Sequence, residues 1–166
     1  LKPLPEESEL AFGTLFTDHM FNMDYDPDNG WHYPRIEPYG PFPMDPSTMV
    51  LHYGQSIFEG LKAFKTPEKS IQLFRPEHNF TRFNRSAHRM CIPVLDEQFA
   101  LKATKELVRL DSRWVPSAPG TSLYIRPTIV ATDPFLGVRA SNTYRFFIIR
   151  SPVGAYYKEG FNPVKI

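Results

Sequence analysis

The 166-residue sequence has a single cysteine, Cys91, so it cannot form an intrachain disulfide or a site built on several thiolates. Its longest apolar runs fall well short of the ~20 residues that a membrane-spanning helix needs. The net charge is only +1, which gives no electrostatic reason to expect nucleic acid or an anionic membrane as a partner. We therefore expect neither partner. The lone cysteine suits a reducing compartment, so we expect a cytoplasmic protein, with a processed mitochondrial enzyme as the alternative.

Several familiar catalytic patterns are also missing. The sequence has no GxSxG elbow for a serine nucleophile and no glycine-rich phosphate loop. Its five histidines show no HxxxH spacing or carboxylate pattern that would bring metal ligands together. We therefore expect no metal site.

The sequence does have many aromatic residues and prolines. Apolar residues make up 42% of it and aromatic residues 14%, which indicates a packed core and rules out a disordered chain. The length suits one domain. Its 17 prolines are about twice the average usage of ~5%, so we expect rigid, irregular connections between the elements.

The first part of the chain predicts two β-hairpins. Residues 15–24 and 31–38 read as strands joined by the turn YDPDNG, and Pro34 places the second strand near a sheet edge or bulge. Residues 60–65 and 70–74 read as a second pair around TPEK.

Two helices are predicted in the middle of the chain. One begins near Pro76 and ends before Pro93, and Cys91 would be a small buried side chain on its apolar face. The other is capped by Asp96. The apolar residues recur at three- and four-residue spacing: Phe80, Phe83, Ala87 and Met90, then Ala100, Ala103, Leu107, Leu110 and Trp114. With strands at 121–132 and 143–150, the pattern predicts an α+β fold, a mainly antiparallel sheet with two adjacent helices.

Two stretches, LHYGQSIFEGLKAF (51–64) and SLYIRP (122–127), resemble motifs of the branched-chain aminotransferases, which are fold-type IV pyridoxal-phosphate enzymes. Four further matches keep the same order along the chain: FGTLFTDHM from Phe12, FNRSAHRM from Phe83, LGV from Leu136 and SPVGAY from Ser151.

This resemblance implies the small, N-terminal domain of such an enzyme. Residues 1–11 would form an arm, 12–152 the small α+β domain, and 153–166 the start of the connection to a large domain that this sequence does not include. The Schiff-base lysine would lie beyond Ile166, so Lys62 and Lys65 are rejected for that role. The complete enzyme would be a homodimer that uses pyridoxal 5'-phosphate to transfer the amino group of leucine, isoleucine or valine to 2-oxoglutarate.

An arginine is the expected cofactor ligand. Arg82, Arg85 and Arg89 share one side of the predicted helix, and their spacing alone favours a solvated basic face. In the family, the arginine three residues before the RSA triplet binds the cofactor phosphate, and Arg82 occupies that position. Arg85 and Arg89 would remain surface residues.

The substrate side is expected from six family positions and one residue pair. Tyr124 and Arg126 are two apart on a strand and face the same way. The resemblance places the tyrosine near the α-carboxylate and the arginine near the distal carboxylate of 2-oxoglutarate. It adds apolar walls, a loop that reaches the neighbouring subunit and an aromatic in the interdomain connection: Phe12, Tyr53 and Phe58, then Leu136 and Val138, then Tyr156. By sequence alone, Phe12, Tyr53 and Phe58 are more typical of a plain core.

Three alternatives remain open from the sequence. Another fold-type IV enzyme, a D-amino-acid aminotransferase or an aminodeoxychorismate lyase, would have the same fold, although the two main motifs fit the branched-chain group better. The arginine-bearing helix could contact nucleic acid, against which the near-neutral charge argues. A truncated product with a scaffolding role is the third.

Overall fold

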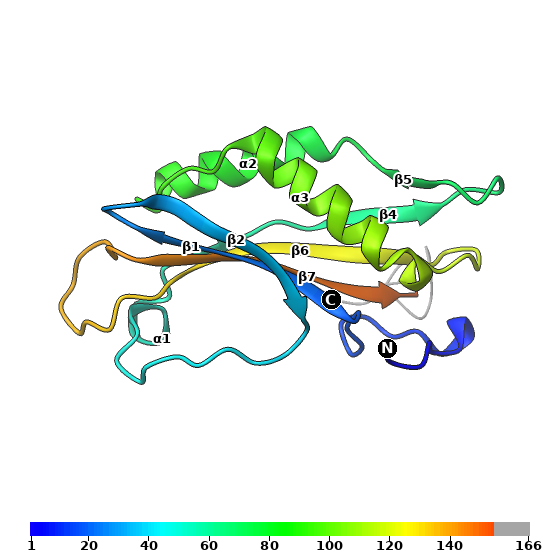
Figure 1. Ribbon diagram of the computed structural model, residues 1–166, viewed down its shortest axis with the longest axis horizontal. Helices are drawn as coiled ribbons and strands as arrows, with labels where there is room; N and C mark the ends of the chain where they lie inside the picture. Colours follow the sequence, from blue (N-terminus) through cyan, green and yellow to red (C-terminus); the bar gives the residue numbers. More distant parts are fainter. Residues whose placement is uncertain (155–166) are drawn as a thin grey trace, which may run out of the picture.

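The computed structural model describes residues 1–154 and consists of an antiparallel sheet with two helices packed on one face (Figure 1). The seven strands run in the order β2-β1-β7-β6-β4-β5, and β3 pairs with β6. The strands are β1 (His19–Asp26), β2 (Gly30–Pro38), β3 (Ser56–Phe58), β4 (Leu61–Lys65), β5 (Ile71–Leu73), β6 (Ser122–Ala131) and β7 (Tyr144–Val153). The helices are α1 (Met49–Tyr53), α2 (Pro76–Arg89) and α3 (Glu97–Leu110), with 3₁₀ turns at Glu7–Glu9 and Ser112–Trp114. The predicted α+β class is confirmed.

Both predicted hairpins form. β1 pairs with β2 and β4 with β5, each antiparallel. Pro34 lies in β2, which is an edge strand of the sheet, where a residue without an N–H donor is tolerated. The prediction that the first strand starts at residue 15 is wrong, because β1 begins at His19. The residues just before β1 are not part of a strand, and the Phe16 ring stacks on the Tyr39 ring with 4.8 Å between the ring centroids.

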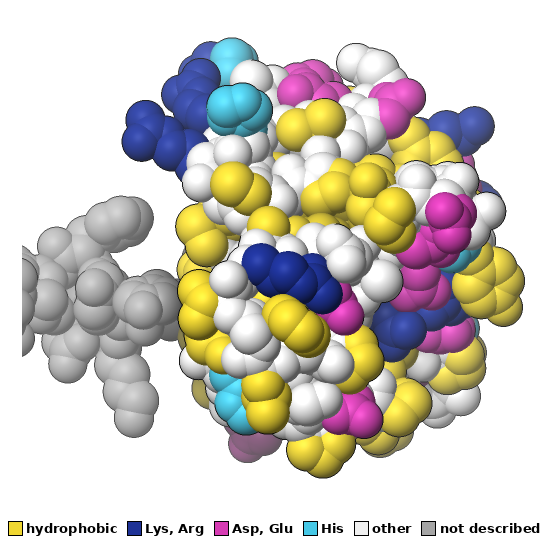
Figure 2. Space-filling model, turned by 90° about the vertical axis from the view of Figure 1, so that its left-hand side faces the viewer, with side chains coloured by type: hydrophobic (Ala, Val, Ile, Leu, Met, Phe, Trp, Pro, Cys, Tyr) yellow, Lys and Arg dark blue, Asp and Glu magenta, His cyan; other side chains and the backbone are white. Residues whose placement is uncertain are grey.

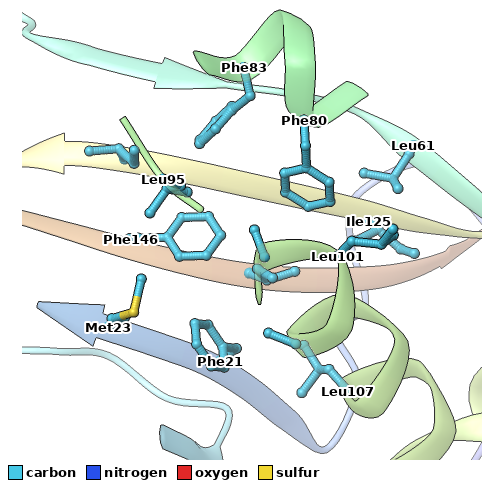
Figure 3. Packing of buried hydrophobic residues seen from close by; sticks show 14 of the residues in the cluster. Phe21, Met23, Leu61, Phe80, Phe83, Leu95, Leu101, Leu107, Ile125 and Phe146 are labelled. Atoms are coloured by element: carbon cyan, nitrogen blue, oxygen red, sulfur yellow. The ribbon is translucent and has the colours of Figure 1, made fainter. Parts of the chain in front are cut away.

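The core lies between the sheet and the two long helices. Alternate residues of β6 and β7 point toward the helices, which sends Ile125, Ile129 and Phe146 into the core. From α2, the Phe83 ring lies 5.9 Å from that of Phe146, and α3 contributes Leu107 (Figure 3). The helical spacing predicted most of the buried positions correctly, namely Phe80, Phe83, Ala87, Ala100, Ala103 and Leu107. It is wrong at Met90 and Leu110, which are exposed where the helices end, and Trp114 is buried in the 3₁₀ turn after α3 and not in the helix. The opposite face of β6, which carries Tyr124 and Arg126, is turned away from the helices.

Both predicted helix starts are confirmed, and one expectation at a helix end is wrong. α2 starts at Pro76, and the Asp96 carboxylate accepts a hydrogen bond of 3.0 Å from Phe99 N–H at the start of α3. Cys91 is exposed, not buried. α2 ends at Arg89, two residues before it, and Cys91 adopts a positive φ of 54° that turns its side chain out of the helical pattern. No helix within residues 1–154 is long and apolar enough to cross a membrane.

The segment between the two hairpins contains a short helix and strand that the sequence did not predict. α1 ends at Tyr53, and the next residue, Gly54, closes the helix in the left-handed conformation with a φ of 65°. β3 then pairs with the C-terminal half of β6, with Phe58 opposite Thr128. With five and three residues, these elements are too short for a hydrophobic period to show.

The N-terminal arm is tied to the domain by polar contacts. Lys2 N–H donates to Asp18 at 2.8 Å, and the Glu7 carboxylate accepts from the N–H groups of Ser117 and Ala118 at 3.0 and 2.6 Å. Burial alone would raise the pKa of Asp18, but hydrogen bonds from Trp114, Lys2 and Arg113 hold it well below its usual range.

A buried ion pair joins the end of α3 to β7. The side chains of Asp111 and Arg150 are 2% and 0% exposed, and their closest oxygen and nitrogen lie 2.5 Å apart. Asp111 also accepts from His19 Nδ1 at 2.8 Å, and Arg150 donates to the carbonyl oxygens of Leu107 and His19. Burial lowers the pKa of Arg150 to about 10, although Asp111 opposes that shift. These contacts fix β1, α3 and β7 relative to one another.

Candidate functional site

Arg82 lies on the exposed side of α2 and forms a two-pronged ion pair with Glu59. Its Nε donates to one carboxylate oxygen and its Nη2 to the other, each at 2.8 Å. Burial alone would raise the pKa of Glu59, but hydrogen bonds from Arg82 and Asn79 together with the charge of Arg82 lower it. The same pair raises the pKa of Arg82. The guanidinium plane is therefore set by a carboxylate from the β3–β4 connection.

A pocket of about 800 Å³ opens beside Arg82, between the start of α2 and strands β4 and β5. Arg75, His78 and Lys62 line it together with Arg82, and none of the described residues that line it is acidic. A cavity of this size with several cationic side chains and apolar walls suits an anionic small molecule. The interpretation that Lys62 does not carry the cofactor stays a prediction, although Lys62 does line this pocket.

Tyr124 lies at the junction of this pocket and a smaller one. A Cβ at Gly60 would lie 2.4 Å from the Tyr124 hydroxyl, so a larger residue here would displace the Tyr124 ring from its present position. Arg126 donates from Nε and Nη2 to the Tyr124 hydroxyl at 3.1 and 2.8 Å. The predicted pair therefore faces one way, as the strand period requires, and its two polar groups contact each other.

Two of the expected apolar residues contact this pair, and one of them, Phe12, lines the smaller pocket with it. This pocket measures about 190 Å³ and is lined by Phe12, Tyr124 and Arg126 with neighbours from β7. The rings of Phe12 and Tyr124 lie 5.0 Å apart, and the Arg126 guanidinium lies over the ring of Phe58 at 4.1 Å. Phe12 and Phe58 are exposed, so the interpretation of each as plain core is wrong for this part of the chain.

Tyr53 and Leu136 form a second group. The Tyr53 hydroxyl donates to the carbonyl oxygen of Leu136, in the loop between β6 and β7. Tyr53 is exposed too, against its interpretation as core, and Val138 in the same loop is 89% exposed. This end of the molecule, which carries α1 and the loop, shows hydrophobic side chains among charged ones (Figure 2). Such apolar exposure is typical of a surface that another chain segment covers.

The remaining predicted residues fall into two cases. Arg85 and Arg89 are exposed on α2, as the sequence predicted for surface residues. Tyr156 and the connection from residue 155 onward lie outside the described residues.

Sequence reasoning missed the partners that hold the predicted site. Glu59 and Gly60 stand inside the motif LHYGQSIFEGLKAF, yet nothing in their spacing pointed to Arg82 or Tyr124. The available signal was their place in the strongest motif of the chain.

Two curated proteins are similar to this chain over nearly its whole length. The chain is 59% identical over 165 residues to branched-chain-amino-acid aminotransferase 2 of Bacillus subtilis, and 54% identical over 166 residues to branched-chain-amino-acid transaminase 1 of the same organism. Both matches cover 99% of this chain. The chain belongs to the branched-chain aminotransferase family. No family model matches the sequence.

Solved structures of this aminotransferase family have the same fold. A branched-chain amino acid aminotransferase solved with pyridoxamine 5'-phosphate superposes with a TM-score of 0.66 at 26% identity, over 87% of this chain and 43% of that one. The branched-chain aminotransferase of Thermoproteus uzoniensis with norvaline gives 0.66 at 24% identity over 84% of this chain and 43% of that one, which supports the fold alone.

The chain spans about half the length of the curated relatives it matches, 46% and 47% of the two Bacillus subtilis proteins. It corresponds to the N-terminal part of a branched-chain aminotransferase. Activity, substrates and partners therefore concern a longer protein.

Proposed function

We propose that the full-length protein is a branched-chain amino-acid aminotransferase that uses pyridoxal 5'-phosphate and transfers the amino group of leucine, isoleucine or valine to 2-oxoglutarate. The observation that carries the proposal is the 59% identity to a protein of that name over nearly the whole chain. The named relatives favour the branched-chain group over the two alternative fold-type IV enzymes.

The residues around Arg82 fit the phosphate of this cofactor. A guanidinium has five N–H donors, and Glu59 takes two of those of Arg82. The remaining donors are available to an anion, since the Arg82 side chain is 57% exposed and lines the basic pocket. When bound, the cofactor would supply the electron sink for the amino-group transfer. This chain's part is to hold the phosphate.

We assign substrate binding to the smaller pocket, which Tyr124 also lines. Tyr124 and Arg126 would orient the carboxylates of the substrate by charge-assisted hydrogen bonds, and Phe12 and Phe58 would contact an aliphatic side chain. Arg126 would supply a positive charge, because an apolar pocket cannot bury the distal carboxylate of 2-oxoglutarate without a cation. We also assign Tyr53 to this site, and Tyr156 would cover it.

The proposed domain organisation follows the family. Residues 1–11 form the arm, 12–152 the small domain and 153–166 the start of the connection to a large domain. That domain would supply the Schiff-base lysine, so this chain has no catalytic residue of its own. The proposal places the enzyme in the cytoplasm, which suits the free thiol of Cys91.

Arg82→Lys in the full-length protein tests the phosphate assignment. Lysine keeps the charge but loses the planar fork, so pyridoxal 5'-phosphate should bind more weakly by about 1–3 kcal/mol, the scale of a hydrogen bond to a charged group. Absorbance titration of the cofactor measures the change. Arg85→Lys and Arg89→Lys serve as controls on the same helix. Equal losses in all three variants would contradict the assignment.

We propose further that the enzyme is a homodimer in which Leu136 and Val138 reach the partner's pocket. Val138→Asp would place a charge in that contact, and the desolvation penalty should reduce both dimerisation and leucine turnover by about tenfold or more. Analytical ultracentrifugation and a leucine assay measure the two effects. Asn142→Asp, an exposed change near the end of the same loop, is the control. Full activity in a monomeric wild-type protein would rule the dimer out.

A further inference from the structure

The ion pair between Glu59 and Arg82 has one partly buried and one exposed member. The side chain of Glu59 is 12% exposed and that of Arg82 is 57% exposed. A long, exposed arginine side chain has many rotamers, and holding it in one costs entropy. The carboxylate, which is the less exposed group, is therefore the fixed member of the pair, and the guanidinium takes its position from it.

Glu59 is itself held from several sides. Asn79 on α2 donates from Nδ2 to the Oε2 atom at 2.9 Å, and Gly60 N–H lies 3.3 Å from the same oxygen. The backbone N–H of Glu59 donates to the carbonyl oxygen of Pro127 in β6 at 3.0 Å. The carboxylate is thus anchored to the sheet and to the helix that carries Arg82.

The pairing geometry determines which edge of Arg82 stays free. Glu59 occupies Nε and one N–H of Nη2, which leaves both N–H groups of Nη1 and the second N–H of Nη2. Two parallel N–H groups of this kind match two oxygens of a phosphate.

We propose that Glu59 is a positioning residue for cofactor binding: it fixes the guanidinium plane of Arg82 so that the free edge faces the phosphate of pyridoxal 5'-phosphate in the basic pocket. This inference rests on the proposed function, in which Arg82 binds that phosphate. Glu59 acts only through Arg82 and touches neither cofactor nor substrate.

The sign of the expected effect separates this role from simple electrostatics. Removing a negative charge beside a phosphate site lowers repulsion, so a purely Coulombic role for Glu59 predicts tighter phosphate binding in Glu59→Gln. A positioning role predicts the opposite, because glutamine offers only one acceptor oxygen and the two-pronged pairing is lost. Glu59→Asp separates the two roles in a second way, because aspartate keeps the negative charge but has a side chain one methylene shorter, which cannot hold Arg82 in the same position.

The experiment compares two ligands that differ in the phosphate. Pyridoxal 5'-phosphate and pyridoxal are titrated by absorbance into the full-length protein, from which cofactor has first been removed. Glu59→Gln and Glu59→Asp should each weaken pyridoxal 5'-phosphate about tenfold, the order expected when an outer partner of a ligand residue is lost. Pyridoxal affinity should change less than twofold. In an Arg82→Lys background, Glu59→Gln should have no further effect.

Glu106→Gln is the matched control, because Glu106 pairs with Arg109 at 2.9 Å away from this pocket. Unchanged or tighter pyridoxal 5'-phosphate binding in both Glu59 variants would overturn the inference while the proposed function stands. Equal losses for pyridoxal would also overturn it, since they indicate a general structural role. An unsubstituted protein that does not prefer pyridoxal 5'-phosphate over pyridoxal would contradict the proposed phosphate site, and the inference with it.

Discussion

Arg126→Met is expected to weaken the reaction with 2-oxoglutarate by about 30-fold while leaving that with leucine within about threefold. The guanidinium lies over the Phe58 ring at the margin of the smaller pocket and would neutralise the distal carboxylate of the amino acceptor. Truncating one partner of a buried charge pair costs about 2–5 kcal/mol, and the partial exposure of Arg126 places the effect at the low end. Each half-reaction is followed separately by cofactor absorbance in the full-length protein.

The structure also supplies the competing explanation. Arg126 donates two hydrogen bonds to the Tyr124 hydroxyl, so it could act only by holding that ring. In that case Arg126→Met and Tyr124→Phe would impair leucine and 2-oxoglutarate alike. Arg145→Met, on the same face of the sheet but paired with Asp24, is the control. Equal losses for both substrates would remove the account of dual recognition.

Asp111→Ala is expected to lower the free energy of unfolding by about 3–5 kcal/mol, the cost of breaking a buried ion pair by removing one partner. Arg150 would keep its charge in a fully buried position, where its Nε already has no hydrogen-bond partner within residues 1–154. Urea unfolding of the chain, followed by fluorescence of the buried Trp114, measures the loss.

A matched control removes a carboxylate from an exposed pair. Glu106→Ala breaks the contact with Arg109 and should cost less than about 1 kcal/mol, as exposed ion pairs do. The double variant Asp111→Ala/Arg150→Met should be more stable than Asp111→Ala alone, because it leaves no uncompensated charge. Similar losses for Asp111→Ala and Glu106→Ala would contradict this view of the buried pair.

The sequence predicted an element of the fold wherever a hydrophobic period extended over enough residues. α2 and α3 each span 14 residues, so three- and four-residue spacing identified most of their buried residues and failed only where the helices end, at Met90 and Leu110. The turn residues identified both hairpins. α1 and β3 are too short for that signal and are fixed by Gly54 and by pairing with β6. Cys91 was misplaced because the apolar spacing continued past the point at which α2 ends.

The sequence predicted which residues form the candidate site, but it did not predict the contacts that hold them in place. Family motifs gave Arg82, Tyr124 and Arg126, and strand alternation placed the last two on one face. Spacing could not reveal the contact of Arg82 with the carboxylate of Glu59, which lies 23 residues earlier in the chain. Contacts between distant segments depend on the packed sheet, which local sequence patterns do not encode.

The central claim is tested most directly by amino-group transfer from leucine to 2-oxoglutarate. The full-length protein should form glutamate, should lose that activity when cofactor is removed, and should regain it with pyridoxal 5'-phosphate. The chain 1–166 alone should form none, since the proposed large domain supplies the Schiff-base lysine. A cofactor-loaded full-length protein that transfers no amino group from leucine, isoleucine or valine, or a chain 1–166 that does so alone, would contradict the account.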